Sequence, residues 1–253
     1  MVKVSDIYKS FDENQVLKGI DAEFHRGKTN LIIGQSGSGK TVFLKCLVGL
    51  HTPDSGRISF NEQVYSELTL KEQRKIRMEI GMVFQGSALF DSMSIEENIM
   101  FPLRMFTKQS DEEMRERVNV VLDRVNLENV NSKFPSELSG GMQKRVAIAR
   151  AISMQPKYLF CDEPNSGLDP KTAIVIDNLI KEITEEYNIT TIINSHDMNS
   201  VMEIGENIIL IKEGLKKWEG NKEDIFRTDN PAILDFVFSS ELFRKVREAY
   251  NAK

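Results

Sequence analysis

The sequence predicts an α/β protein in which a parallel sheet carries helices on both faces. Apolar runs of strand length lie at Tyr158–Cys161, Thr190–Asn194 and Ile208–Ile211. A segment with the length of a helix, Lys171–Tyr187, separates the first two runs. Strands that alternate with helices in this way are typical of parallel sheets. Strand-like runs vanish between about residues 94 and 154, so we expect a helical insertion there.

Composition excludes several other classes of protein. The chain has 253 residues, of which 40% are hydrophobic, and a formal net charge of −5. The apolar content argues against disorder, and no apolar run approaches the roughly 18–20 residues that cross a bilayer. The N-terminus lacks the apolar block of a signal peptide. Cys46 and Cys161 lie in apolar segments, which predicts buried free thiols in a cytoplasmic protein.

The first fifty residues read as short strands followed by a helix. Val2–Ile7 and Ile20–His25 alternate polar and apolar residues, as strands with one buried face do. Thr29–Ile33 is a compact apolar run that ends at Gly34. A helix is expected over Lys40–Leu50, where His51–Pro53 stops it.

The remaining elements follow from spacing and turn signals. Asp111–Val125 has an acidic first turn and apolar residues at helical spacing, which predicts a helix with one buried face. Glu213–Gly214 marks a turn, so Ile208–Ile211 and Leu215–Trp218 should form a hairpin at the sheet edge. We expect the main domain to cover residues 1–220.

Residues 221–253 are expected to form a helical tail. Four aromatic or apolar residues recur there at spacings of seven, three and four, which predicts one helical stripe with Ser240 as its N-cap: Phe236, Phe243, Val246 and Tyr250. The stripe could pack on the chain's own core or reach across to a second subunit, and the sequence does not decide between these two.

A glycine-rich segment lies between the Thr29–Ile33 strand and the following helix. It fits the pattern G-x-x-x-x-G-K-[ST], in which successive backbone N–H groups and a helix N-terminus face a phosphate. Lys40 supplies a mobile charge for the β and γ phosphates, and the Thr41 hydroxyl is a ligand for Mg²⁺. We expect ATP to contact the residues Gly34, Gln35, Ser36, Gly37, Ser38, Gly39, Lys40, Thr41 and Val42.

Polar residues follow three of the predicted strands, at the edge where ligands gather in such sheets. Asp162 is placed to hold the Mg²⁺ shell, and Glu163 to act on the water that attacks the γ phosphate. His196 follows the Thr190–Asn194 strand and is expected to contact the γ phosphate. Gln85 ends a further short strand and is expected to reach the metal or the attacking water.

A second candidate anion site lies at the start of a later helix. Leu138–Gln143 has Ser139 followed by Gly140 and Gly141, which combines a hydroxyl, free N–H groups and a helix dipole. With these two sites and the acidic strand end in this order, the chain resembles the ATP-binding cassette (ABC) ATPases over about residues 2–219. The resemblance implies a P-loop NTPase (RecA-like) core with an antiparallel β subdomain and an inserted helical subdomain.

The resemblance also implies an assembly. In that family Ser139, Gly140 and Gly141 would close over the nucleotide of another subunit, which gives a head-to-tail homodimer with two ATP molecules at the interface. Ser166–Asp169 matches the loop that links the two sites, so Asp169 is a candidate for nucleotide contact. Phe11 falls at the aromatic position that stacks on adenine, with Phe where many members have Tyr.

Two features resemble the lipid-trafficking branch of the family that is associated with Mce-domain proteins, of the Mla (maintenance of lipid asymmetry) type. They are Met142, where most members have Gln, and the stretch Gln85–Ser92. This branch implies a multi-spanning permease similar to MlaE, an Mce-domain protein, phospholipid as cargo, and a peripheral position on the cytoplasmic face of the inner membrane. The permease would insert a helix into a groove lined by Leu89, Phe90, Met93, Ile95, Phe101 and Leu103.

Three alternatives share the same catalytic residues. An ATPase of an amino-acid or other small-solute importer differs only in its permease. An ABC ATPase that acts on nucleic acid or ribosomes usually carries a second cassette, a coiled-coil insertion or a basic patch, none of which is visible in this sequence. A division-type ATPase would have a membrane partner that moves nothing.

Overall fold

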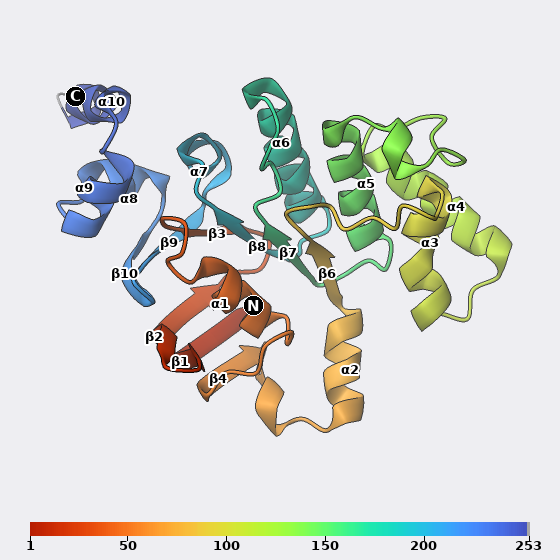
Figure 1. Ribbon diagram of the computed structural model, residues 1–253, viewed down its shortest axis with the longest axis horizontal. Helices are drawn as coiled ribbons and strands as arrows, with labels where there is room; N and C mark the ends of the chain where they lie inside the picture. Colours follow the sequence, from red (N-terminus) through yellow and green to blue (C-terminus); the bar gives the residue numbers. More distant parts are fainter. Residues whose placement is uncertain (252–253) are drawn as a thin grey trace.

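Two β-sheets form the framework of the computed structural model, which describes residues 1–251 (Figure 1). The larger sheet has six strands in the order β10-β9-β3-β8-β7-β6, and the smaller has four in the order β2-β1-β4-β5. The strands are β1 Val2–Phe11, β2 Asn14–Phe24, β3 Thr29–Ile33, β4 Ser55–Phe60, β5 Gln63–Val64, β6 Ile80–Val83, β7 Tyr158–Asp162, β8 Thr190–Ser195, β9 Asn207–Lys212 and β10 Leu215–Gly220.

The six-stranded sheet is parallel apart from its β9–β10 hairpin. Every residue of β3, β7 and β8 is buried, as expected of strands covered on both faces. The predicted α/β class is therefore confirmed, and β10 occupies the sheet edge as the turn at Glu213–Gly214 predicts. The smaller sheet is antiparallel and lies beside α1 (Figure 1).

The helices lie between and beyond the strands. They are α1 Lys40–Leu47, α2 Leu70–Met78, α3 Ile95–Phe106, α4 Asp111–Arg124, α5 Gly140–Ile152, α6 Pro170–Glu186, α7 Met198–Ile204, α8 Lys222–Arg227, α9 Pro231–Val237 and α10 Glu241–Asn251. Helices α3, α4 and α5 fill the stretch predicted to be a helical insertion, and they group at one side of the molecule (Figure 1).

Capping boxes fix where four of these helices begin, with Asp224 answering Asn221 at α8 and a Glu in the other three. Thr69, Ser94 and Ser110 each accept the backbone N–H three residues on, while a Glu side chain accepts theirs in return. The cap at Thr69 starts α2, a polar helix that apolar spacing did not predict. Helix α1 ends at Leu47 rather than at the predicted Leu50, because Gly49 adopts a left-handed φ of 75°.

The prediction of one helical stripe in the tail is wrong. Phe236 lies on α9, whereas Phe243, Val246 and Tyr250 lie on α10, and the chain breaks between the two helices. The break occurs at Ser240, whose hydroxyl accepts the N–H of Phe243 at 3.4 Å, so this residue caps α10 as predicted.

The described part of the tail packs on the chain's own core. Four of its side chains are buried in the same apolar cluster as β7 and β8: Ile225, Ile233, Val237 and Phe238. Phe226 and Tyr250 stack with ring centroids 5.0 Å apart, which ties α10 to α8. Leu242 and Val246 remain exposed on α10, at 68% and 42%.

Both cysteines are buried and free, as predicted. Burial raises the pKa of Cys46 to about 11, and it also raises the pKa of Cys161, which makes both thiols unreactive. Within residues 1–251, no helix combines the length and the apolar content that a membrane crossing requires.

Candidate active site

The phosphate loop runs from the end of β3 into α1, in the strand-to-helix setting that the motif requires. Two of its glycines are indispensable: Gly34 has φ 149° and a Cβ there would lie 2.2 Å from the Ile211 carbonyl oxygen, while Gly39 has φ 105°. The Ser38 hydroxyl is buried without a hydrogen-bond partner. An orphaned donor in this position fits a loop built to receive an anion.

Lys40 is buried at the centre of this loop. Its Nζ donates to the carbonyl oxygens of Gly34 and Gln35, at 2.8 and 3.0 Å. Burial lowers the pKa of Lys40, although the nearby Glu163 and Asp162 carboxylates oppose that shift. The ammonium is therefore held in the loop by neutral carbonyls alone, and it can turn to a phosphate without breaking an ion pair.

Two of the three residues predicted to hold the metal, Thr41 and Asp162, contact each other at the strand edge, whereas the third, Gln85, bonds to Glu163. Thr41 Oγ1 donates to Asp162 Oδ1 at 3.2 Å, and Asn194 Nδ2 donates to the same oxygen at 3.0 Å. The side-chain Oδ1 of Asn194 is buried and has no hydrogen-bond partner. Mg²⁺ takes oxygen ligands and is usually held by one or two protein groups with phosphate and water. These oxygens fit that requirement. Among residues 1–251, no group of three or more His, Cys, Asp or Glu side chains is arranged so that it could hold a metal ion by itself.

Glu163 is the meeting point of the three predicted catalytic residues. Gln85 Nε2 donates to Glu163 Oε2 at 3.1 Å, and His196 Nδ1 lies 2.9 Å from Glu163 Oε1. The Glu163 backbone has φ 47°, in the left-handed region that non-glycine residues rarely adopt. The Glu163 carboxylate lies close enough to Lys40 of the phosphate loop for its charge to act on the pKa of that ammonium.

Two cations that sequence-based reasoning missed support the Gln85 loop. Lys144 Nζ donates to the Gln85 carbonyl, and the Arg150 guanidinium donates to the carbonyls of Ser87 and Ala88 at 2.9 and 2.8 Å. Burial lowers the pKa of both Lys144 and Arg150. Ser87 and Ala88 have positive φ, so the loop is strained and these donors stabilise it. The signal in the sequence is that Lys144 and Arg150 lie among the apolar residues of helix α5, whose third charged residue is Arg145.

The second predicted anion site lies at the start of α5. Ser139 is the N-cap of that helix, and its hydroxyl accepts the N–H of Met142 at 3.3 Å. Asp169 caps the neighbouring helix α6 by accepting from Lys171 N and Thr172 N, each at 3.1 Å. The two starts are adjacent, because a Cβ on Gly141 would lie 2.7 Å from the Thr172 methyl group.

Phe11 is exposed at 41%, so it does not serve core packing. The ring meets the edge of His51 with centroids 5.3 Å apart, and Lys9 Nζ lies 5.3 Å from its centroid. An exposed ring with a cation beside it is suited to stacking on a flat aromatic ligand.

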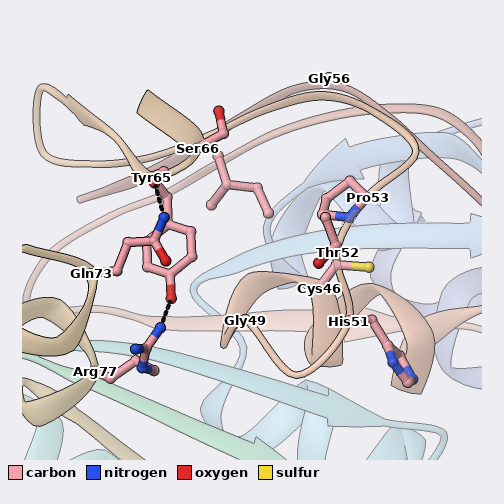
Figure 2. A pocket seen from close by; sticks show the side chains of 11 residues that line it. Cys46, Gly49, His51, Thr52, Pro53, Gly56, Tyr65, Ser66, Gln73 and Arg77 are labelled. Atoms are coloured by element: carbon pink, nitrogen blue, oxygen red, sulfur yellow. Dashed lines mark hydrogen bonds between the residues drawn. The ribbon is translucent and has the colours of Figure 1, made fainter. Parts of the chain in front are cut away.

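A cavity of about 290 Å³ lies at the opposite end of α1 from the phosphate loop (Figure 2). The one cationic side chain that lines it is already engaged, since Arg77 donates to the Tyr65 hydroxyl at 2.5 Å, and Gln73 donates to the Tyr65 carbonyl at 3.2 Å. The C-terminal end of a helix carries partial negative charge. Phosphate binding is therefore disfavoured there, and the loop before α1 remains the nucleotide site.

An apolar groove lies beside the Gln85 loop, where one was predicted. Its volume is about 410 Å³, and it is lined by Ile80, Gly81, Met82, Phe84, Ala88, Phe90, Phe101, Pro102, Arg150, Ala151 and Met154. Of the six residues predicted to line it, only Phe90 and Phe101 do so, and Leu89 and Met93 are not part of its lining. The other two, Ile95 and Leu103, are buried in the core at 0% and 2% exposure. Both face the inside of α3, while Phe90 and Phe101 pack together at the surface with centroids 4.8 Å apart.

Comparison with known proteins decides the family. The family profile described as "ABC transporter" matches residues 17–166. The chain belongs to the ABC transporter family. The methionine import ATP-binding protein MetN of Clostridium tetani is 37% identical over 96% of this chain and 76% of its own length. The probable ribonucleotide transport ATP-binding protein mkl of Mycobacterium leprae is 35% identical over 93% of this chain and 68% of its own length.

Solved ABC cassettes have the same fold. The cassette MJ0796, in a dimeric post-hydrolysis state bound to ADP and Pi, aligns with a TM-score of 0.80 at 34% identity, over 88% of this chain and 99% of its own. The cbiO1 protein of Clostridium perfringens, part of the ABC transporter complex cbiONQ, aligns with a TM-score of 0.83 at 32% identity, over 99% and 98%. This chain is thus an ABC ATPase with the P-loop NTPase fold, and it binds ATP.

Proposed function

We propose that Glu163 is the general base of ATP hydrolysis in this ABC ATPase. The observation that supports this role is the placement of its two carboxylate oxygens, one bonded to Gln85 and the other to His196. A carboxylate oriented from both sides keeps one geometry toward a substrate water. The Gln85 amide orients the attacking water through Glu163, and the His196 ring contacts the γ phosphate.

The other residues of this edge bind and orient the nucleotide. Lys40 exchanges its two loop carbonyls for the β and γ phosphates, where its charge offsets the charge that develops during transfer. Thr41, Asp162 and Gln85 hold Mg²⁺, which supplies further neutralisation of phosphate charge when it is bound. Phe11 stacks on the adenine, and the loop from Gly34 to Gly39 donates its N–H groups to the phosphates.

The active form is a head-to-tail homodimer with two ATP molecules at its interface. Ser139, Gly140 and Gly141 of one copy close over the nucleotide that the other copy binds, and Asp169 stabilises the loop between the two sites. The adjacency of Ser139 and Asp169 in one chain supports this arrangement, because both helix starts would face one partner surface. Residues 1–220 form the ATPase domain, and the tail from residue 221 follows it.

The cargo that we propose is phospholipid, moved through a multi-spanning permease with an Mce-domain protein. The ATPase would then act as a peripheral subunit on the cytoplasmic face of the inner membrane, and it would contact the membrane through its partner alone. Support comes from Met142, from the stretch Gln85–Ser92, and from the apolar groove beside that stretch. A groove with Phe90 and Phe101 at its rim is suited to the apolar face of a short helix.

Import of an amino acid is the second candidate, and the similarity to MetN favours it. Purification of the complex from detergent distinguishes the two. A permease that carries bound phospholipid supports lipid transport, whereas ATPase activity that depends on a soluble solute-binding protein supports import and contradicts the lipid proposal.

The role of Glu163 has its own test. Glu163→Gln keeps the hydrogen-bonding shape but removes the base, so hydrolysis should fall by roughly 10²–10⁴-fold while ATP still binds. Turnover measured by phosphate release, with ATP binding measured in parallel, checks this. Hydrolysis near the wild-type rate in that variant would show that another group is the base.

A further inference from the structure

A buried polar cluster includes Asn165, which lies two residues after Glu163 in the chain. Asp177 on α6 is 2% exposed, Ser200 on α7 is 2% exposed, and Asn165, in the loop after β7, is 8% exposed. Asn165 Nδ2 donates to both Asp177 oxygens, at 3.2 and 3.4 Å, and it lies 2.7 Å from Ser200 Oγ. The Ser200 hydroxyl also hydrogen-bonds to Asp177. One carboxylate therefore joins three segments of the chain.

The loop that carries Asn165 is the segment that needs such a restraint. Glu163, two residues earlier, has the left-handed φ of 47° described above. A non-glycine residue in that region is strained, and it persists only where the surroundings over-determine it. The loop's own bonds are two backbone turns, from Ser166 N to Glu163 O at 3.1 Å and from Leu168 N to Asn165 O at 3.2 Å. Asn165 supplies the buried side-chain anchor.

The same cluster also restrains the helix that follows His196, the residue that contacts Glu163 Oε1. Helix α7 begins at Met198, two residues after His196, and Ser200 lies in its first turn. The 2.9 Å contact between His196 and Glu163 therefore joins two segments that Asp177 holds from behind, one through Asn165 and the other through Ser200.

We propose that Asp177 is a positioning residue for ATP hydrolysis. Its carboxylate accepts hydrogen bonds from Asn165 and Ser200, and it thereby keeps Glu163 and His196 in a fixed position relative to each other. This inference rests on the proposed roles of Glu163 and His196. Asp177 itself touches neither nucleotide nor attacking water. Its contribution is to keep the strained loop and the start of α7 in one relative position, which is where small displacements have large kinetic effects.

The charge of this carboxylate matters for the restraint. Burial, with the negative charges of Asp197 and Glu203 beside α7, raises the pKa of Asp177 to about 6. Cys161 on β7 also lies near it, and its thiol is neutral. A cavity of about 440 Å³, which Phe243 of α10 also lines, reaches Asp177 and lets protons exchange. Protonation turns one acceptor oxygen into a donor, so Asn165 and Ser200 lose part of their shared acceptor.

The experiment measures kcat and KM for ATP between pH 5.5 and 8 in the full-length chain. In Asp177→Asn, kcat should fall roughly tenfold to a hundredfold at pH 8 while KM changes little. The loss of kcat on the acid side, centred near pH 6 in the wild type, should disappear. The matched control is Glu203→Gln, which lines the same cavity without a direct bond to Asp177.

Glu203→Gln removes a negative charge that raises the pKa of Asp177, so it should keep kcat at pH 8 and move the acid-side loss a few tenths of a pH unit lower. An acid-side loss that stays in place overturns the proposal, even if Asp177→Asn fails to fold. Wild-type kcat in folded Asp177→Asn also overturns it. Glu163→Gln separates the positioning role of Asp177 from the catalytic role of Glu163. If Glu163→Gln is inactive while Asp177→Asn has wild-type kcat, only the positioning role is refuted. If Glu163→Gln is fully active, the assignment of Glu163 as the general base is refuted.

Discussion

Replacement of Asp177 by Asn should change stability in a way that depends on pH. The wild-type chain holds this carboxylate 2% exposed, with the pKa raised from the ordinary 3.8 to about 6. Because folding raises this pKa, the group lowers the stability of the folded state by about 3 kcal/mol at pH 7, where the carboxylate is ionised while buried. At pH 5 the loss is roughly half as large, because the group is ionised in the unfolded chain but mostly protonated in the folded one. Below the unfolded value of 3.8, the cost vanishes, since the group is neutral in both states.

Asn carries no charge, so the variant is free of this cost at every pH. Its amide brings two N–H donors into a buried site where the carboxylate had none, which removes a constant amount of stability of about 1–3 kcal/mol. The difference in free energy of unfolding, variant minus wild type, should therefore fall by roughly 1–2 kcal/mol between pH 7 and pH 5. Urea denaturation of both proteins at the two pH values measures it. A difference that is constant with pH, or that rises toward pH 5, would refute the charged, buried state of Asp177.

Three further outcomes are expected. Lys40→Ala should weaken ATP binding by about 2 kcal/mol, roughly thirtyfold, because a charge-assisted contact to phosphate is lost; calorimetric titration measures it, and unchanged affinity would contradict the assignment. Phe90→Glu, at a groove ring that is 40% exposed, should reduce recovery of the permease on detergent purification without altering ATP binding, whereas Phe134→Glu, at a ring outside the groove that is 43% exposed, should not. Deletion of residues 239–253 should weaken the ATP-bound dimer if the tail crosses to the partner; an unchanged mass by light scattering would leave packing on its own core as the tail's only role.

Much of the fold could be predicted because its signals are local. Thr29–Ile33 is a compact run with three aliphatic residues at its end, Gly34 follows it directly, and β3 has those same bounds. Helix α2 was missed because it is polar and rests on a cap at Thr69 rather than on an apolar stripe. The prediction of one helical stripe in the tail failed because the regular spacing of apolar residues continues across Ser240, whereas the helix is interrupted there.

For the candidate site, too, the residues with a local sequence signal could be predicted and those without one could not. The phosphate loop, Asp162 and Glu163 could be predicted, since each stands at the end of an apolar strand. Lys144 and Asp177 could not, because their bonds join residues far apart in sequence or across helices: Lys144 reaches the Gln85 carbonyl 59 residues away. A buried charge leaves no periodic pattern, and its partner becomes visible only when packing brings the two together.

Helix α5 has a mechanical consequence. It is about 20 Å long at 1.5 Å per residue, its first turn carries Ser139, and its Lys144 and Arg150 grip the Gln85 loop. The groove wall at Arg150 and Ala151 belongs to the same helix. A tilt of helix α5 would thus move the groove, the loop beside Glu163 and the Ser139 cap together, because all three are attached to this one helix. Force applied by a helix in the groove would reach the active site without any further moving part.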